Sequence, residues 1–246
     1  MISFAIPNYN RVDNVVKLVN EHADNECVSE IVICDDASRQ EFIMPLREAV
    51  RNIPKVRLIE NDTNYGLFRN KLRTVVACRQ PWVVLCDSDN FMDKNYVDTL
   101  YCEEPWDSST VYCPSVAGPF DFRKVAGQTM ANLQQMETVL SQLGANFTVF
   151  CNTGNYFFNR DRYIHVCNHI HTLGLNPDQL WAAEVYAINF AWVALGGKIK
   201  CVEGLSYFHD TTNTDSAWRK IVGTREGRAA SNALYAGLRQ RIQAGR

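Results

Sequence analysis

Four short apolar segments near the start of the chain alternate with amphipathic helical patterns, and each segment runs into polar residues. The segments cover 2–6, 30–34, 56–60 and 82–86. The helical patterns between them carry apolar residues three or four apart: Val12, Val15, Val16, Val19; Ile43, Leu46, Val50; Phe68, Leu72, Val75, Val76. This alternation predicts an α/β fold with a mostly parallel central sheet flanked by helices on both faces. The polar strand ends then share one edge, where open α/β sheets bind ligands.

The fourth apolar segment ends in Asp87-Ser88-Asp89. Two carboxylates that bracket one small residue form a compact oxygen site. Such a site suits a hard divalent ion, Mg²⁺ or Mn²⁺, which keeps positions for phosphate oxygens. The motif therefore predicts an enzyme that holds a nucleotide diphosphate through a metal. A turn that caps the next helix is the alternative.

Four motifs in this region share their order and spacing with a known family. They are Pro7-Asn8-Tyr9-Asn10-Arg11, Cys34-Asp35-Asp36-Ala37-Ser38, Asn64-Tyr65-Gly66 with Arg69-Asn70, and Asp87-Ser88-Asp89. The chain resembles the family 2 glycosyltransferases, nucleotide-sugar enzymes with the GT-A fold, closely over 1–95. The resemblance is looser beyond, at Thr153–Phe158, around Glu184 up to Gly196-Gly197-Lys198-Ile199, and at Tyr207-Phe208-His209.

The resemblance implies a nucleotide site built from the strand ends and the loops that follow them. Its expected residues are Pro7, Tyr9, Arg11, Asp35, Asp36, Asn64, Gly66, Arg69, Asp87 and Ser88. Asp35 and Asp36 would contact the base and the ribose. Alternatively, one of the two caps the following helix in a strand-end turn. Arg69 lies near a helix start, where a cation gains nothing from the helix dipole; it contacts the nucleotide or is a solvated surface residue.

The expected metal ligands are Asp89, Asp87 and His209. Asp89 would bind Mn²⁺ or Mg²⁺ directly, because the second carboxylate usually carries the metal in the resembling family. Asp87 would support it directly or through water, and the family often places a third ligand at the position of His209. The metal would neutralise the charge that develops on the departing diphosphate. The alternatives are a helix cap or ribose contact for Asp87 and a packed or solvated His209.

Glu184 is the expected catalytic base. Inverting members of the family usually show Glu-Asp at a helix start, whereas here Glu184 is followed by Val185. On a helix Glu184 shares a face with Trp181 and Ile188, so desolvation is expected to raise its pKa and make it a competent base. A buried Glu that accepts bonds from a nearby loop is the alternative. Asp178 is expected to be the N-cap of this helix.

The rest of the chain is less regular. It predicts a strand at Val111–Cys113 within loops, a helix through Leu133–Leu143, a strand at Phe147–Phe150, and then two helices, two short strands and a helical tail. No linker divides the chain. We expect one domain over 1–246, with a nucleotide half at 1–100, an acceptor half at 101–215 and a basic helical tail at 216–246.

Composition restricts the partners. A net charge of −2 argues against a nucleic-acid partner, because phosphate-backbone binders usually need a basic face. The chain lacks an apolar run of membrane-spanning length, and because the first predicted strand starts at Ile2 we expect no signal peptide. The nine cysteines show no metal-ligand spacing, so we expect free thiols in the cytoplasm. The basic tail is a solvated face or a peripheral contact with anionic lipid.

Two functions of different class follow. The first is a metal-dependent glycosyltransferase, expected to invert the anomeric centre. It would move a sugar from a nucleotide-diphosphate sugar, with a UDP-sugar favoured, to a carbohydrate or glycosylated acceptor. The second is a catalytically silent module that binds sugar nucleotides or glycans, which the missing acid at Val185 favours. A nucleotidyltransferase is disfavoured, because the chain start lacks a Gly-rich phosphate loop with a following Lys or Arg.

Overall fold

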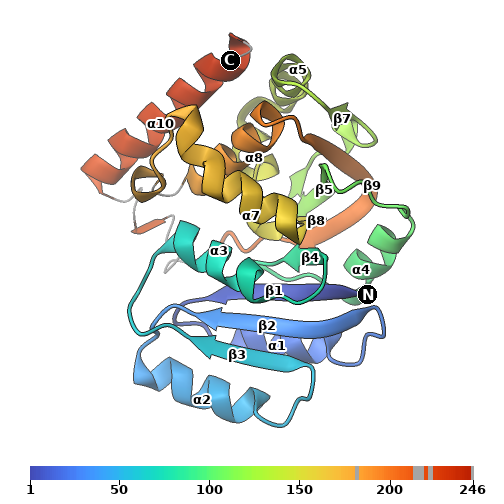
Figure 1. Ribbon diagram of the computed structural model, residues 1–246, viewed down its shortest axis with the longest axis vertical. Helices are drawn as coiled ribbons and strands as arrows, with labels where there is room; N and C mark the ends of the chain where they lie inside the picture. The colour runs from blue at the N-terminus through green and yellow to red at the C-terminus, as the bar shows by residue number, and fades with distance from the viewer. Residues whose placement is uncertain (181–182, 213–218, 221–223, 245–246) are drawn as a thin grey trace.

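The computed structural model describes residues 1–180, 183–212, 219–220 and 224–244. A mixed sheet in the order β3-β2-β1-β4-β8-β5-β9-β7 runs through the molecule, and β6 pairs with β5 (Figure 1). The strands are β1 (Ile2–Asn8), β2 (Val28–Asp35), β3 (Val56–Glu60), β4 (Trp82–Leu85), β5 (Thr110–Gly118), β6 (Phe120–Asp121), β7 (Thr129–Met130), β8 (Phe157–Asn159) and β9 (Lys198–Phe208).

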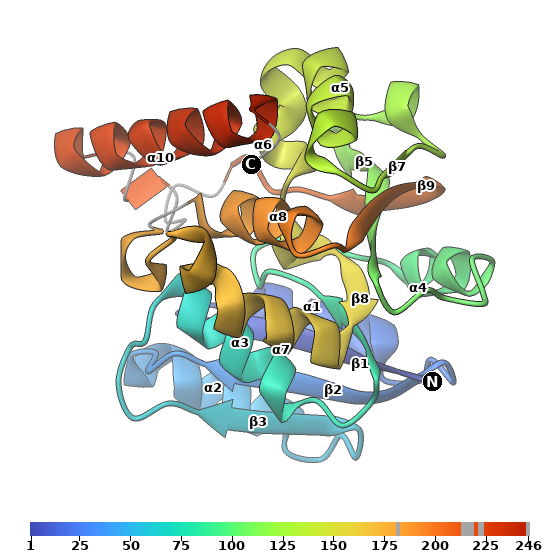
Figure 2. The ribbon, with the colours of Figure 1, turned by 45° about the horizontal axis from the view of Figure 1, so that its top comes forward.

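Helices lie on both faces of this sheet. They are α1 (Asp13–His22), α2 (Gln40–Val50), α3 (Leu67–Ala77), α4 (Lys94–Tyr101), α5 (Leu133–Leu143), α6 (Phe147–Phe150), α7 (Arg160–His169), α8 (Glu184–Ala194) and α10 (Arg225–Gln243). Helices α1 and α2 pack against each other on the face of the sheet that lies behind β2 and β3 in Figure 2, whereas α3 lies in front of β1 and β2 and contacts α7 (Figure 2). The predicted α/β fold is confirmed.

The first four strands form the parallel part of the sheet. β1 pairs with β2 and β4, and β2 pairs with β3, all in parallel. β1 is buried along its whole length because strands flank it and helices cover both of its faces, which explains why its sequence is nearly all apolar. The carboxyl ends of these strands meet at one edge, as the sequence predicts.

The second half of the sheet is mixed. β8 lies between β4 and β5 and is antiparallel to both. β5 then pairs in parallel with β9, and β7 pairs with β9 in the opposite direction. The parallel expectation therefore holds for the nucleotide half, and β8 is where the strand direction reverses.

Three local predictions are wrong. Phe147–Phe150 is the short helix α6, because an apolar run of four residues fits either a strand or a buried helical turn. The two short strands expected late in the chain are one strand, β9, which continues through Gly204. Gly204 has a φ of 78°, which glycine adopts without the strain that a side chain would cause. Val76 was expected inward on α3 but is 47% exposed.

The chain end packs onto the acceptor half. Helix α10 contacts α5 and α8 (Figure 2), and Arg239 pairs with Glu137 of α5 at 2.8 Å. Trp218 and Arg246 of the predicted basic tail lie outside the described residues. Among the helices that the structure describes, none combines the length and the apolar character needed to cross a bilayer. All nine cysteines are free thiols, seven of them buried.

Candidate functional site

The Asp87-Ser88-Asp89 loop leaves β4 at the carboxyl edge and folds into a tight turn. Asp87 N donates to the Gly154 carbonyl at 2.8 Å, and Asn90 N donates to the Asp87 carbonyl at 2.9 Å. Gly154 lies so close to this turn that a Cβ there would overlap the Asp87 carboxylate. The segment before β8 therefore fixes where Asp87 can lie.

Two buried asparagines join this loop to the end of β9. Asn155 Oδ1 accepts from Asn90 Nδ2 at 3.0 Å, and Asn90 Oδ1 accepts from Asp210 N at 3.1 Å. Phe91 and Phe208 also form an isolated antiparallel bridge. These contacts bring His209 beside the acidic loop, although the two are far apart in the sequence.

Asp89 and His209 lie close enough to influence each other's charge. Burial raises the pKa of Asp89, and the Asp87 carboxylate raises it further, against the opposing charges of Arg11 and His209. Burial lowers the pKa of His209, although Asp89 and Asp87 oppose the shift. A neutral imidazole beside two carboxylates is a donor set that divalent metals accept.

Asp87 points toward the protein interior and shares a cation with Glu184. Lys71 Nζ lies 2.9 Å from Asp87 Oδ1 and 3.0 Å from Glu184 Oε1. Asn155 Nδ2 donates to the second oxygen of Asp87 at 3.4 Å. Burial raises the pKa of Asp87, and the Lys71 ammonium opposes that rise. Both oxygens of Asp87 thus have protein partners.

Glu184 is the first residue of α8 and is 3% exposed. A carboxylate in the first turn is favoured by the helix dipole. Its Oε1 accepts from Lys71, whereas its Oε2 is buried without a hydrogen-bond partner within the described part of the chain. Because α8 begins at Glu184, Asp178 does not cap it. Trp181 and the side chain of Asp178 lie outside the described residues.

Asp35 and Asp36 are both buried and hydrogen-bonded to the protein. Asp35 accepts from Asn8 Nδ2 at 2.8 Å and from Ser38 Oγ at 2.6 Å. Asp36 Oδ1 accepts from Asn61 Nδ2 and Tyr65 N, both at 2.8 Å, and its Oδ2 accepts from Gly66 N at 2.9 Å. In this structure Asp35 closes the turn after β2 and Asp36 anchors the loop before α3. Their contact with a nucleotide stays a prediction.

The other predicted nucleotide residues surround the same edge. Pro7 and Ser88 are buried, Arg11 is half-buried, and Asn64 and Arg69 are exposed. Tyr9 is 43% exposed directly after β1. Gly66 precedes α3 with a φ of 81°, a conformation that side chains disfavour. The predicted nucleotide-binding residues therefore lie at or near the carboxyl ends of the strands, and their contact with a nucleotide stays a prediction.

The described side chains at the carboxyl edge supply too few donors to hold a metal ion by themselves, so a bound ligand would have to supply the others. Within the described residues, no group of three His, Cys, Asp or Glu side chains is placed to hold a metal ion. Asp89 and His209 could supply two donors. Mg²⁺-type sites commonly use one or two carboxylates and complete their shell with substrate phosphates and water. The donor chemistry therefore fits a metal that binds together with a nucleotide diphosphate.

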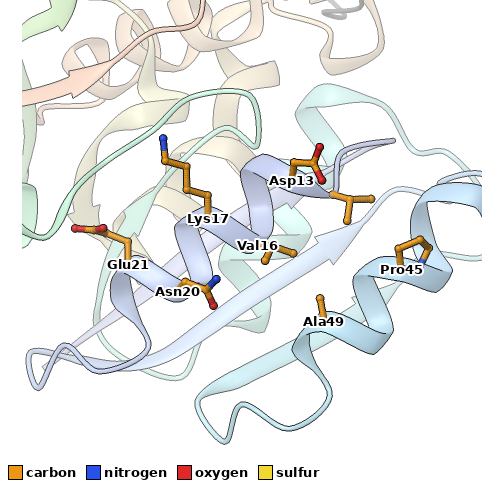
Figure 3. A pocket seen from close by; sticks show the side chains of 8 residues that line it. Asp13, Val16, Lys17, Asn20, Glu21, Pro45 and Ala49 are labelled. Carbon is orange, nitrogen blue, oxygen red and sulfur yellow. The ribbon is translucent and has the colours of Figure 1, made fainter.

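A shallow groove of about 640 Å³ lies elsewhere on the surface, between α1 and α2 (Figure 3). Its lining includes Val16, Lys17, Pro45 and Ala49. Its described lining contains none of the predicted site residues. We place the candidate functional site at the carboxyl edge of the sheet, because the acidic loop and His209 lie there, and not in this groove.

Three buried polar residues were missed by sequence reasoning: Lys71, Asn90 and Asn155. Lys71 carried a readable signal, because it stands on the apolar face of α3 between Phe68 and Val75, and a charged residue on such a face is rarely buried without a partner. Asn90 and Asn155 carried no such signal, since their roles depend on contacts between distant segments.

Comparisons with known proteins identify the family and the fold. The sequence profile described as Glycosyl transferase family 2 matches residues 3–166. The chain is 33% identical over 100 residues to chondroitin synthase of Escherichia coli, a match covering 40% of this chain and 14% of that protein. It is similar in structure to S. aureus TarS in complex with UDP-GlcNAc, with a TM-score of 0.62, 15% identity and coverage of 88% of this chain and 60% of that chain.

A second solved structure is the mannosyltransferase PcManGT from Pyrobaculum calidifontis in complex with GDP-Man and Mn²⁺. The likeness has a TM-score of 0.59 and 12% identity, and it covers 89% of this chain and 59% of that chain. At these identities the structural matches establish the fold, which is GT-A. The chain spans less than two thirds of the length of each of these proteins.

Proposed function

The chain belongs to glycosyl transferase family 2, and we propose that it moves a sugar from a nucleotide-diphosphate sugar to an acceptor hydroxyl with help from a divalent metal. The acidic loop after β4 carries this proposal, because Asp89 and His209 lie together at the strand edge where α/β sheets bind nucleotides. The TarS and PcManGT complexes hold UDP-GlcNAc and GDP-Man, which supports a nucleotide-sugar donor. We favour a UDP-sugar.

Asp89 and His209 would hold Mn²⁺ or Mg²⁺, and Asp87 would support the loop that carries Asp89. Burial disfavours the charged form of Asp89, and the neighbouring Asp87 carboxylate adds to that effect. A cation at this position relieves both effects. When bound, the metal supplies a positive charge that stabilises the diphosphate as it leaves. Asp87 is held from behind by Lys71 and Asn155, so we assign it support of the loop and not direct ligation.

Glu184 would take the proton from the acceptor. The acceptor oxygen forms a bond to the anomeric carbon, the bond from that carbon to the diphosphate breaks, and the hydroxyl proton passes to Glu184 Oε2. The buried Oε2 has no partner among the described groups, and a buried oxygen in that state is costly until a donor reaches it. An acceptor hydroxyl would be such a donor. Attack from the face opposite the diphosphate gives inversion.

The ion pair between Glu184 and Lys71 favours a second candidate, a silent module that binds sugar nucleotides or glycans. A carboxylate that only neutralises a buried lysine has no need to meet an acceptor. The two candidates share the nucleotide site and differ in turnover. Only the transferase requires a carbohydrate acceptor, and the assay with oligosaccharides described next would identify it.

The test is donor turnover. Purified protein is incubated with a panel of UDP- and GDP-sugars in Mn²⁺ or EDTA, and release of UDP or GDP is measured with and without oligosaccharide acceptors. The transferase predicts release that requires Mn²⁺, rises with one acceptor and disappears in Asp89→Asn. Binding of a nucleotide sugar without release by the wild-type protein would establish the silent module instead.

A further inference from the structure

Lys71 sits where three separate parts of the fold converge. It lies on α3, and its ammonium contacts a carboxylate of the loop after β4 at 2.9 Å and a carboxylate at the start of α8 at 3.0 Å. The exposed fractions are 6% for the Lys71 side chain, 20% for Asp87 and 4% for Glu184. A single buried cation thus connects the acidic loop to the expected base.

The charge of Lys71 is needed where it lies. Its ammonium lies between the carboxylates of Asp87 and Glu184, at 2.9 and 3.0 Å, and the Lys71 side chain is only 6% exposed. Two carboxylates held close to one another without that cation would repel in a poorly solvated site. Removing one partner of a buried ionic cluster is strongly unfavourable because the charges left behind are uncompensated.

The contact also sets which oxygens are available. Lys71 engages Oδ1 of Asp87 and Oε1 of Glu184, and Asn155 engages Oδ2 of Asp87. Glu184 Oε2 is left over, buried and without a hydrogen-bond partner in the described structure. Lys71 therefore orients the base so that one oxygen remains for a substrate.

We propose that Lys71 is a positioning residue that fixes the metal-binding loop and the base Glu184 in one frame. This inference rests on the proposed function. In this proposal Lys71 acts through its two partners: it holds Asp87, which supports the loop of Asp89, and it orients Glu184. Outer partners of metal-binding groups commonly affect metal affinity by about 10–100-fold.

The direction of the effect separates positioning from simple charge. Lys71→Met removes a positive charge beside the metal site, so electrostatics alone would tighten Mn²⁺ binding. Positioning predicts the opposite, a weakening of Mn²⁺ binding in the presence of UDP by about tenfold. Free Mn²⁺ is followed by its electron paramagnetic resonance signal, which needs no turnover. GDP replaces UDP if the wild-type protein binds GDP more tightly.

Arg57→Met is the matched control. Arg57 pairs with Glu30 at 2.8 Å near the amino-terminal end of β2, away from the site. It should lower the melting temperature and leave Mn²⁺ binding unchanged. Lys71→Met should change both, and it should lower kcat for transfer more than it raises KM for the donor, because the base is misplaced.

A double variant keeps the test decisive if Lys71→Met folds poorly. Lys71→Met with Glu184→Gln restores the net charge of the cluster to its original value, since one cation and one anion are lost. Positioning predicts that the melting temperature recovers while Mn²⁺ binding with UDP stays weak, because Asp87 still lacks its anchor. Recovery of both, or tighter binding in Lys71→Met, overturns the inference. If the wild-type protein binds neither nucleotide with Mn²⁺, the proposed function fails and the inference fails with it.

Discussion

Asp36→Ala tests how the carboxyl edge is held together. Asp36 is 2% exposed and accepts three hydrogen bonds, from Asn61 Nδ2, Tyr65 N and Gly66 N. The substitution removes all three of these bonds, although Gly66 N keeps Asn64 Oδ1 and Asn61 Nδ2 keeps Asn70 Oδ1 as an acceptor. Each loss costs about 1–3 kcal/mol when the group stays buried, but Tyr65 and Gly66 are partly exposed and water can replace the carboxylate there. We therefore expect a loss of about 3 kcal/mol in the free energy of unfolding.

For a chain of this size such a loss lowers the melting temperature by roughly 6–12 °C. Differential scanning calorimetry measures it, and urea denaturation checks it at constant temperature. Asp62→Ala is the matched control, since Asp62 is exposed and its side chain accepts from the Tyr65 hydroxyl within the same loop; its melting temperature should stay near the wild-type value. An Asp36→Ala protein that melts within about 2 °C of wild type would refute the role of Asp36 as the anchor of this loop.

Three further outcomes follow from the contacts of single residues. Gly154→Ala should weaken Mn²⁺ binding with UDP by about tenfold, because a Cβ would displace the Asp87 carboxylate; Gly237→Ala, which meets open space, should not, and equal binding by both would contradict the reasoning. Glu184→Gln should retain donor affinity and slow transfer by roughly 10²–10⁴-fold, and an active variant in a transfer assay would exclude Glu184 as base. Burial alone would raise the pKa of Glu30, but the Ser3 hydroxyl and other donors outweigh it and lower the pKa, so this stability is present above pH 4.5 and is lost as the pH falls through the folded pKa. Glu30→Gln should therefore be less stable than wild type in urea at pH 7, and a gap in the free energy of unfolding that does not shrink as the pH falls below 4.5 would contradict this.

The parallel half of the fold could be predicted because its signals are local. Apolar runs end in polar residues at β1, β2 and β4, and the helical spacing between them is regular, so the shared edge follows from topology alone. The acceptor half gave weaker signals. The run at α6 is too short for its periodicity to separate a helix from a strand, and Gly204 within β9 looks like a break although the strand continues.

The site was predictable in its residue types but not in its contacts. Asp87, Asp89 and His209 were expected together, and the structure places them near one another. That Asp87 turns inward could not be foreseen, because its partner Lys71 is in a helix and the other carboxylate of the cluster, Glu184, lies 113 residues from Lys71. Pairings of this kind depend on how distant segments pack, which one sequence does not encode locally.

The proposed function requires that a divalent metal at Asp89 hold a nucleotide diphosphate at the carboxyl edge of the sheet. Isothermal titration calorimetry of UDP into wild-type protein and Asp89→Asn, each in Mn²⁺ and in EDTA, measures this requirement. We predict binding by the wild-type protein only when Mn²⁺ is present and none by Asp89→Asn, and a cooperative melting transition of the ligand-free variant checks that it is folded. Equal UDP binding by both proteins, or binding by the wild type that EDTA leaves intact, would contradict the claim.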